Sequence, residues 1–159
     1  MDIKVGLGSD IHRLTEGRPL IVGNVHIPHY KGCEGHSDGD ALIHAICDAL
    51  LGAVNQRDIG YHFPDTSMEN KDKDSSFFLY EVMKIVDAQG YEVGNIDTII
   101  SLQKPKLSGF ISQIQQRLSE IMNMDPSQVS VKAKTGEKLG FVGMEEGIQV
   151  DAIVLVKKK

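Results

Sequence analysis

The stretch His36-Ser37-Asp38-Gly39-Asp40-Ala41-Leu42-Ile43-His44 places polar groups with ligand and proton chemistry directly before an apolar run. Over residues 40–54 the apolar side chains recur at helical spacing, which predicts an amphipathic helix. Asp38 or Ser37 is the expected N-cap, because a short side-chain oxygen accepts hydrogen bonds from the free amides of the first turn. His44 would lie one turn into this helix and face back toward the loop that carries His36.

The composition is that of a globular protein with a full core. The chain has 159 residues, of which 41% are hydrophobic and 25% are charged, so we expect one domain over residues 1–159. A formal net charge of −5 argues against general nucleic-acid binding, which needs a basic surface. No stretch approaches the roughly 20 apolar residues of a membrane span. We therefore expect neither a nucleic-acid partner nor a membrane partner.

The two cysteines, Cys33 and Cys47, have no C-x-x-C spacing and no framework typical of secreted proteins. They indicate reduced, half-buried residues of an intracellular protein. The first ten residues lack the basic and apolar regions of a secretion signal. We expect a cytoplasmic protein, and a plastid protein that has lost its transit peptide would share these features.

Alternating apolar residues predict several strands. The first runs from Ile3 into Arg13 and places Asp10 and His12 on one face, because residues i and i+2 of a strand point the same way. A hairpin is expected over residues 20–27, with a turn at Gly23-Asn24. The other expected strands are 96–102, 129–134 and 148–156. The last is apolar on both faces, so it is either central or covered by another subunit.

Two more helices are expected. One covers residues 75–89 and stops at Gly90; the other is capped by Ser108 and buries a stripe that runs from Phe110 to Ile121. The polar segment 55–74 is too long for a simple connector, which is typical of a lid or a disordered loop. The element order predicts an α+β fold, with a small mixed sheet and three helices packed on one face.

Candidate site residues fall into a metal set and several phosphate-binding clusters. Asp10, His12 and His44 offer the oxygen and nitrogen ligands that zinc accepts, although an Asp-x-His pair is common and the spacing alone leaves the assignment open. Cations and hydroxyls suited to phosphate gather in the segments 36–37, 104–106 and 132–138. Each segment taken alone is more typical of a solvated loop than of a phosphate site.

Together these motifs resemble the family of 2-C-methyl-D-erythritol 2,4-cyclodiphosphate synthases. They follow one another in order over nearly the whole chain, and the combination is highly specific. The matching motifs are Asp10-Ile-His12, His36-Ser-Asp-Gly-Asp40 with His44, Asp58-Ile-Gly60, Phe63-Pro-Asp-Thr66, Gln103-x-Pro-Lys106, and Lys132-Ala followed by Glu137-Lys-Leu-Gly-Phe141.

The resemblance implies a homotrimer with active sites between subunits, in which the second face of the sheet is buried. It implies that Asp10, His12 and His44 hold Zn²⁺ or a similar divalent cation. Glu137 would help to hold Mg²⁺ or Mn²⁺ with the diphosphate of a cytidine substrate. The family closes a cyclic diphosphate by intramolecular phosphoryl transfer and releases CMP.

The resemblance also implies roles in catalysis and substrate binding. His36 and Thr135 would stabilise the transition state, and Asp58 would bind the erythritol hydroxyls. The implied substrate-binding residues are Asp10, His12, His36, Ser37, Asp58, Ile59, Gly60, Phe63, Pro64, Asp65, Thr66, Ser67, Lys71, Pro105, Lys106, Leu107, Ala133, Lys134, Thr135, Gly136, Glu137, Phe141 and Met144.

Two other functional classes stay open on the residues alone. A zinc phosphohydrolase would use a vacant metal position to make hydroxide, and its product would be linear. A binding module with structural zinc would need a fourth protein ligand. The sequence offers no obvious fourth ligand near Asp10, His12 and His44, which argues against the binding module.

Overall fold

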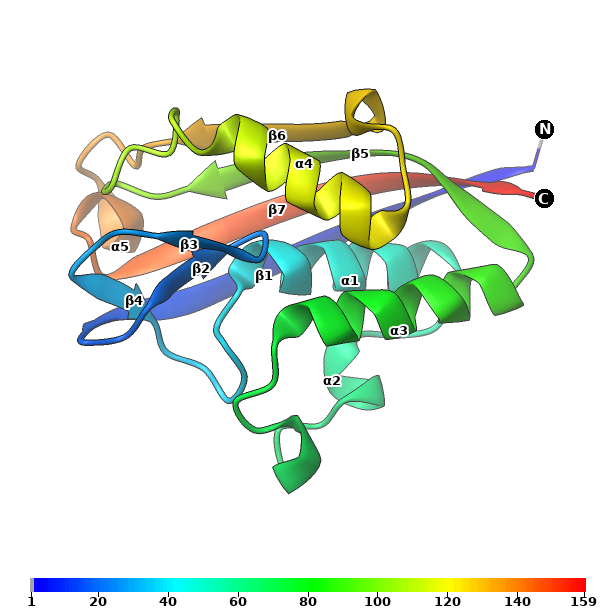
Figure 1. Cartoon of the computed structure of the whole chain (residues 1–159), viewed down its shortest axis with the longest axis horizontal. Coiled ribbons are helices and arrows are strands. Elements are labelled where there is room, and N and C mark those ends of the chain that lie inside the picture. The colour runs from blue at the N-terminus through cyan, green and yellow to red at the C-terminus, as the bar shows by residue number, and fades with distance from the viewer. Residues whose placement is uncertain (1) are drawn as a thin grey trace.

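The protein is built on one long, mixed β-sheet, seen in a computed structural model that describes residues 2–159 (Figure 1). Within that range the sheet has the strand order β4-β1-β7-β5-β6. β5 and β6 are parallel, whereas the other neighbours are antiparallel. The strands are β1 (Ile3–Glu16), β4 (Lys31–Cys33), β5 (Tyr91–Ser101), β6 (Val129–Lys134) and β7 (Gly147–Lys158). β7 is the central strand of this order. This confirms the interpretation that the strand expected over residues 148–156 is central.

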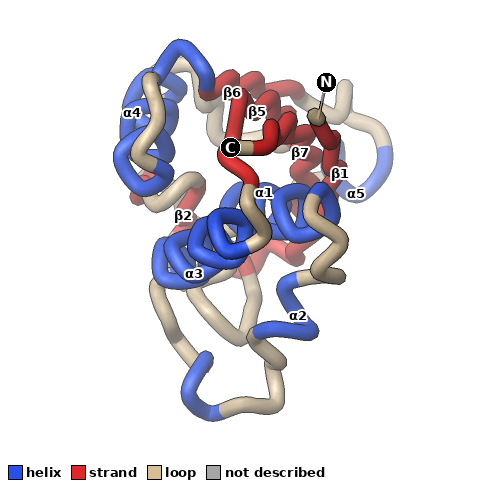
Figure 2. Tube along the Cα trace, turned by 90° about the vertical axis from the view of Figure 1, so that its right-hand side faces the viewer, coloured by secondary structure: helices blue, strands red, loops and turns tan. Residues whose placement is uncertain are grey.

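The main helices lie together on one side of the sheet (Figure 2). α1 packs on β1 and β7, α4 packs on β6, and α3 packs mainly on α1. Their bounds are α1 (Ala41–Ala53), α3 (Ser75–Ala88) and α4 (Ile111–Met122). This arrangement confirms the predicted α+β class and the helix-covered face. Residue 1 of the expected 1–159 domain lies outside the described residues.

Short elements connect these layers. The predicted hairpin is present as a separate antiparallel pair, with its turn at Gly23 and Asn24. Segment 55–74, expected to be a lid or a disordered loop, contains two short helical turns. The short elements are β2 (Leu20–Val22), β3 (Val25–Ile27), α2 (Ile59–His62), the 3₁₀ turns η1 (Met68–Asn70) and η2 (Pro126–Gln128), and α5 (Gly140–Gly143).

The N-cap of α1 is Asp40, so the expectation of Asp38 or Ser37 is wrong. The Asp40 carboxylate accepts from the Ile43 amide at 3.1 Å and also from the two turn amides of the hairpin, Gly23 and Asn24, at 3.0 and 2.7 Å. The Asp40 side chain is fully buried. Sequence spacing favoured the nearer loop residues because it cannot show that the hairpin turn folds back onto the helix start.

The Ser108 cap of α4 is also wrong. The residue before the helix is Phe110, which provides no side-chain cap. Residues 107–110 form a turn in which the Phe110 amide donates to the Leu107 carbonyl at 2.8 Å. Because of this turn, the helix begins only at Ile111. The predicted apolar stripe is buried from Ile114 onward.

The two faces of the central strands differ in burial. The inner face of β7 is buried beneath the helices through Ile148, Val150, Ala152, Val154 and Val156. The outer face carries apolar side chains that are exposed in the single chain: Val5 is 62% exposed, Leu7 69% and Ile153 51%. Leu7 and Ile153 are direct partners in the β1–β7 ladder, so these groups form one continuous surface.

Candidate metal centre and substrate cavities

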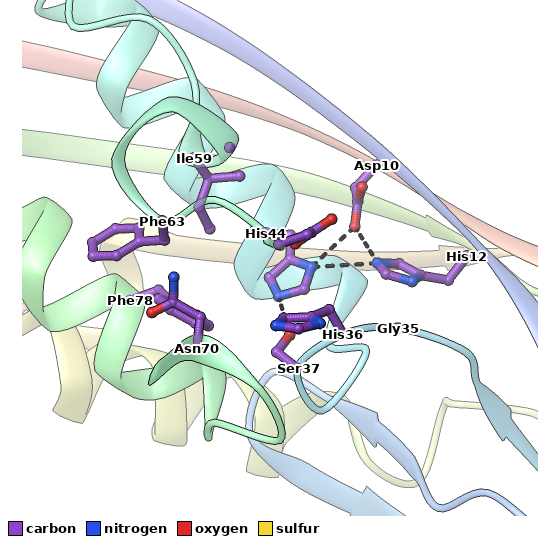
Figure 3. A pocket seen from close by; sticks show the side chains of 12 residues that line it. Asp10, His12, Gly35, His36, Ser37, His44, Ile59, Phe63, Asn70 and Phe78 are labelled. Carbon is purple, nitrogen blue, oxygen red and sulfur yellow. Dashed lines mark hydrogen bonds and ion pairs between the residues drawn. The ribbon is translucent and has the colours of Figure 1, made fainter. Parts of the chain in front are cut away.

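The predicted ligands meet where β1 passes beside the start of α1. Asp10 and His12 come from the helix-covered face of β1, and His44 comes from the second turn of α1 (Figure 3). His12 Nε2 lies 2.7 Å from Asp10 Oδ2, and His44 Nδ1 lies 3.3 Å from the same oxygen. The two ring nitrogens are 3.3 Å apart. These atoms form a group that can hold a metal ion.

The outer nitrogen of each ring is held by another part of the chain. His12 Nδ1 lies 2.5 Å from the Glu34 carbonyl oxygen, and since a carbonyl only accepts, Nδ1 carries the proton. The lone pair of His12 therefore lies on Nε2, the atom that faces Asp10. His44 Nε2 lies 2.8 Å from Ser75 Oγ and 3.2 Å from Ser37 Oγ, which leaves Nδ1 facing the cluster.

The inward atoms fit zinc by their chemistry and spacing. Asp10 Oδ2 is buried and accepts no hydrogen bond of normal geometry from the described residues. Buried lone pairs that face one another need a cation. Four ligands at a Zn–N distance of about 2.0–2.1 Å would lie about 3.3 Å apart at tetrahedral angles. Protein ligands number three here, which is the pattern of catalytic zinc sites that leave one position for water or substrate.

The charges in the cluster are coupled. Burial raises the pKa of the Asp10 carboxyl, but the contacts with His12 and His44 together lower it by more, so that its net pKa lies below the usual value. Burial lowers the pKa of His12, while the contact with Asp10 raises it by more, and the net pKa is raised. A divalent cation that binds here takes the place of a proton.

A cavity of about 210 Å³ adjoins the ligand cluster (Figure 3). Its wall opposite the ligands is formed by α2, which is anchored to α1 because the Asp48 carboxylate accepts from the Ile59 amide at 2.7 Å. Phe63 packs against Phe78 of α3 in a tilted arrangement, with ring centroids 4.9 Å apart. The predicted site residues that line this cavity are Asp10, His12, His36, Ser37, His44, Ile59, Gly60, Phe63 and Asp65.

A second cavity, of about 410 Å³, lies between the end of β5, the end of β6 and the start of α4. It shares no lining residue with the first cavity. β1 and β6 are separated in the sheet by β7 and β5, so one chain does not join the two cavities into a single site. The predicted residues that line the second cavity are Pro105, Lys106, Leu107, Ala133, Lys134 and Thr135.

The remaining predicted residues line neither cavity. Ser67 contacts the site through its backbone, because its carbonyl oxygen lies 3.1 Å from His36 Nε2. Glu137 lies next to Thr135, whose hydroxyl is 3.3 Å from the Glu137 carboxylate. Among the described residues Glu137 joins no metal-ligand cluster. The others outside both cavities are Asp58, Pro64, Thr66, Lys71, Gly136, Phe141 and Met144.

Three polar residues near the cavities were not among the site residues expected from the sequence. Gln103 Oε1 accepts from the Gly136 and Lys138 amides at 3.2 and 3.3 Å and so shapes the loop after β6. Asp38 and Ser75 bond to each other behind His44. Ser75 directly follows an aspartate at a predicted helix start, and this position is the only sequence signal that pointed to it.

The decisive comparison covers almost the whole chain, since the model of the YgbB family matches residues 3–157. This chain belongs to the YgbB family. The 2-C-methyl-D-erythritol 2,4-cyclodiphosphate synthase of Bacteroides fragilis strain YCH46 is 52% identical over 99% of both chains. The synthase of Lysinibacillus sphaericus strain C3-41 is 51% identical over 98% of this chain and 99% of its own. The resemblance recognised in the sequence is thereby confirmed.

A solved structure of a similar protein has the same fold. The structure of a 2C-methyl-D-erythritol-2,4-cyclodiphosphate synthase in a CDP-bound form matches 97% of this chain and 100% of its own, with a TM-score of 0.90 and 37% identity. Both sequence relatives named above are bacterial proteins, and they give no support to the plastid alternative. In the part of the chain that the structure describes, no helix is long and apolar enough to cross a membrane.

Proposed function

We infer that this YgbB-family chain is a metal-dependent 2-C-methyl-D-erythritol 2,4-cyclodiphosphate synthase. It converts 4-diphosphocytidyl-2-C-methyl-D-erythritol 2-phosphate to the 2,4-cyclodiphosphate and releases CMP, a step in the biosynthesis of isoprenoid precursors. The observation that carries this conclusion is the Asp10–His12–His44 cluster in a chain that matches the Bacteroides fragilis synthase over 99% of its length. The cytoplasmic location and the single domain over residues 1–159 are part of the proposal.

The reaction forms and breaks one bond each at the β-phosphorus. An oxygen of the 2-phosphate bonds to this phosphorus, and the bond from the phosphorus to the bridging oxygen breaks, so that CMP leaves with the electron pair. Such a transfer needs in-line positioning and neutralisation of phosphate charge more than covalent help from the protein. The chain must therefore hold two phosphates close together and exclude water that would give a linear product.

The ligand cluster would neutralise part of the phosphate charge. Asp10, His12 and His44 would hold Zn²⁺, which as a Lewis acid withdraws charge from a phosphate oxygen. His36 borders the same cavity, and its Nε2–H donates to the Ser67 carbonyl, which fixes the ring orientation. From this position His36 would stabilise the phosphate charge as the new bond forms. The wall of Ile59, Gly60 and Phe63 would hold the erythritol part.

The second cavity suits the cytidine diphosphate part. Lys106 and Lys134 supply positive charge at its edge, and Thr135 supplies a hydroxyl. Glu137 follows in the same loop and would help to hold Mg²⁺ or Mn²⁺ with the diphosphate, since hard dications favour carboxylate oxygen. The CDP-bound form of the related synthase supports a cytidine nucleotide as the ligand. Gly136, Phe141 and Met144 would complete this binding region.

We also propose that the chain assembles as a homotrimer in which each active site lies between two subunits. The outer apolar face of β1 and β7 would be buried at this interface, since monomers rarely leave a continuous patch of this kind exposed. A closed ring would place the zinc-binding cavity of one subunit beside the nucleotide cavity of the next. This arrangement would join two cavities that share no lining residue within one chain.

Product analysis tests the reaction. The purified protein is incubated with the substrate and divalent metal, and phosphorus NMR follows the phosphates. We expect CMP and a cyclic diphosphate in equal amounts. A linear phosphorylated product instead would identify a zinc phosphohydrolase and overturn the synthase assignment.

Subunit mixing tests the shared site. His12→Ala removes a ligand from one cavity, and Lys106→Glu reverses a charge in the other, so each variant alone should be nearly inactive. After the two are unfolded and reassembled in equal amounts, about one site in four should combine two intact halves, by the statistics of a cyclic head-to-tail interface. A mixture as inactive as its parents, with subunit exchange verified by mass, would exclude sharing between these residues.

A further inference from the structure

The outer nitrogen of His44 is backed by a buried serine and a carboxylate. His44 Nε2 lies 2.8 Å from Ser75 Oγ, and Ser75 is fully buried at the first residue of α3. The Asp38 carboxylate accepts from the Ser75 backbone amide at 2.8 Å and also from the Ser75 hydroxyl. Two segments far apart in sequence, the start of α1 with its preceding loop and the start of α3, therefore form the series of contacts Asp38–Ser75–His44 behind the metal ligands.

The number of protons decides the direction of these bonds. A serine hydroxyl has one proton, and Ser75 donates it to Asp38, which as a carboxylate only accepts. Toward His44 the Ser75 oxygen can therefore only accept, so His44 Nε2 must carry the ring proton. The lone pair of the neutral ring then lies on Nδ1, which faces Asp10 Oδ2. Ser37 Oγ, at 3.2 Å from Nε2, is free to rotate its own proton away.

We propose that Asp38 and Ser75 are positioning residues of the metal centre, which hold His44 in the one tautomer that presents Nδ1 to a metal. The other histidine is set differently, since His12 donates to the main-chain carbonyl of Glu34. The His44 side of the centre therefore depends on side chains and can be altered by substitution. Outer partners of metal-bound histidines fix ring tautomer and orientation in this way, and their loss weakens metal binding by about 10- to 100-fold.

Substitutions of Ser75 and Asp38 should have non-additive effects on zinc affinity. Ser75→Ala removes the acceptor and should weaken zinc binding by about 10- to 100-fold. Asp38→Ala frees the Ser75 proton to point at His44 Nε2, which favours the tautomer that blocks Nδ1. Zinc binding by Asp38→Ala should thus be at least as weak as by Ser75→Ala. Combining the two substitutions should bring no further loss, because the misdirected proton is then absent.

The zinc dissociation constant is measured by competition with a chromogenic chelator, and folding is checked by thermal unfolding. Ser76→Ala is the matched control, since it deletes the same hydroxyl one residue further along α3, where the side chain bonds to Asp74 rather than to His44. Ser75→Thr keeps the hydroxyl and should bind zinc like the unsubstituted protein. Equal zinc affinity in Ser75→Ala and Ser76→Ala, or losses in the single variants that simply add, would overturn the proposal.

A direct measurement covers the case in which a variant does not fold. Long-range proton–nitrogen NMR of the unsubstituted, zinc-free protein at alkaline pH reports which nitrogen of each neutral imidazole carries the proton, and His44→Gln assigns the signals. We expect the proton of His44 on Nε2. A proton on Nδ1 would refute the proposed role of Asp38 and Ser75. The inference rests on the metal site of the proposed function, and that site fails separately if His12→Ala still binds zinc fully.

Discussion

Gly8 of β1 lies against Ala45 of α1 so closely that a Cβ on Gly8 would be 2.0 Å from the Ala45 carbonyl oxygen. Gly6 meets Ala49 one turn further along in the same way, at 1.8 Å. Asp10 follows Gly8 on the same face of β1, and His44 directly precedes Ala45. The absence of side chains at these glycines therefore sets the separation between the strand and the helix that carry the metal ligands.

Gly8→Ala should force α1 away from β1, because the obstructing atoms are backbone and cannot rotate aside. We expect a loss of about 3 kcal/mol or more in the free energy of unfolding, at the upper end for overpacked cores, with weaker zinc binding. Urea denaturation measures the first effect. Gly52→Ala is the control: nothing lies within 4 Å of the added carbon, and alanine in a helix should stabilise by about 0.5–1 kcal/mol. Equal stability of the two variants would contradict the close-contact argument.

His12→Ala should lose bound zinc while the protein stays folded. The side chain of His12 is 15% exposed, and it lies near the end of the sheet rather than among the apolar core residues. Metal analysis after dialysis, together with thermal unfolding, measures both properties. His26→Ala removes an exposed histidine of β3 and should change neither. Full zinc occupancy in His12→Ala would remove His12 from the site.

Asp40 should make stability depend on pH. Burial and, to a smaller extent, the neighbouring Asp38 carboxylate raise the pKa of Asp40 against the opposing effect of the Asn24, Ile43 and Gly23 amides, and the net pKa is about 6. Because the folded pKa exceeds the unfolded value of about 3.9, the stabilising contribution is complete below about pH 4 and is lost as pH rises through 6. The shift corresponds to about 3 kcal/mol.

Asp40→Asn removes this titration but also one acceptor of the buried amides. The variant should thus be less stable than the unsubstituted protein at pH 4, and the difference should shrink by about 3 kcal/mol between pH 4 and pH 7. Urea denaturation at a series of pH values measures the two curves. Parallel curves over this range would show that Asp40 does not titrate in it.

The outer sheet face should govern assembly. Leu7→Lys places a charge in the centre of the apolar surface, opposite Ile153 on β7, and should shift the protein from trimer to monomer. Light scattering after size-exclusion chromatography measures the mass. Met68 is 76% exposed on η1, away from this face, so Met68→Lys should leave the mass unchanged. An unaltered trimer mass in Leu7→Lys would exclude this face from the interface.

Local patterns were enough to predict most of the fold. The two-residue period of β1 gave the shared direction of Asp10 and His12, and the helical period of residues 40–54 gave α1 with His44 on it. The errors fell where distant segments decide local structure. Asp40 is the cap of α1 because the hairpin turn brings its amides to that carboxylate, and no pattern within the helix contains that information.

The candidate site likewise contains residues that the sequence predicts and residues that it does not. The ligand types of Asp10, His12 and His44 could be read from their chemistry, and the resemblance joined them into one centre. The Asp38–Ser75 pair could not be read, because its two residues are 37 positions apart and each alone is typical of an ordinary loop or helix start. Glu137 shows the opposite limit: its motif is clear, yet among the described residues it belongs to no group of three or more potential metal ligands.

The exposed face formed by Val5, Leu7 and Ile153 has a consequence for the chain in the cell before any catalysis begins. A newly synthesised chain that has folded but met no partner presents this apolar surface to chaperones and proteases. If the chain assembles as the proposed trimer, the time spent in that state shortens as more copies accumulate, because association is concentration-dependent. The survival of each copy therefore depends on the rate at which other copies are made. When synthesis slows, the amount of assembled protein should fall by a larger factor than the rate of synthesis.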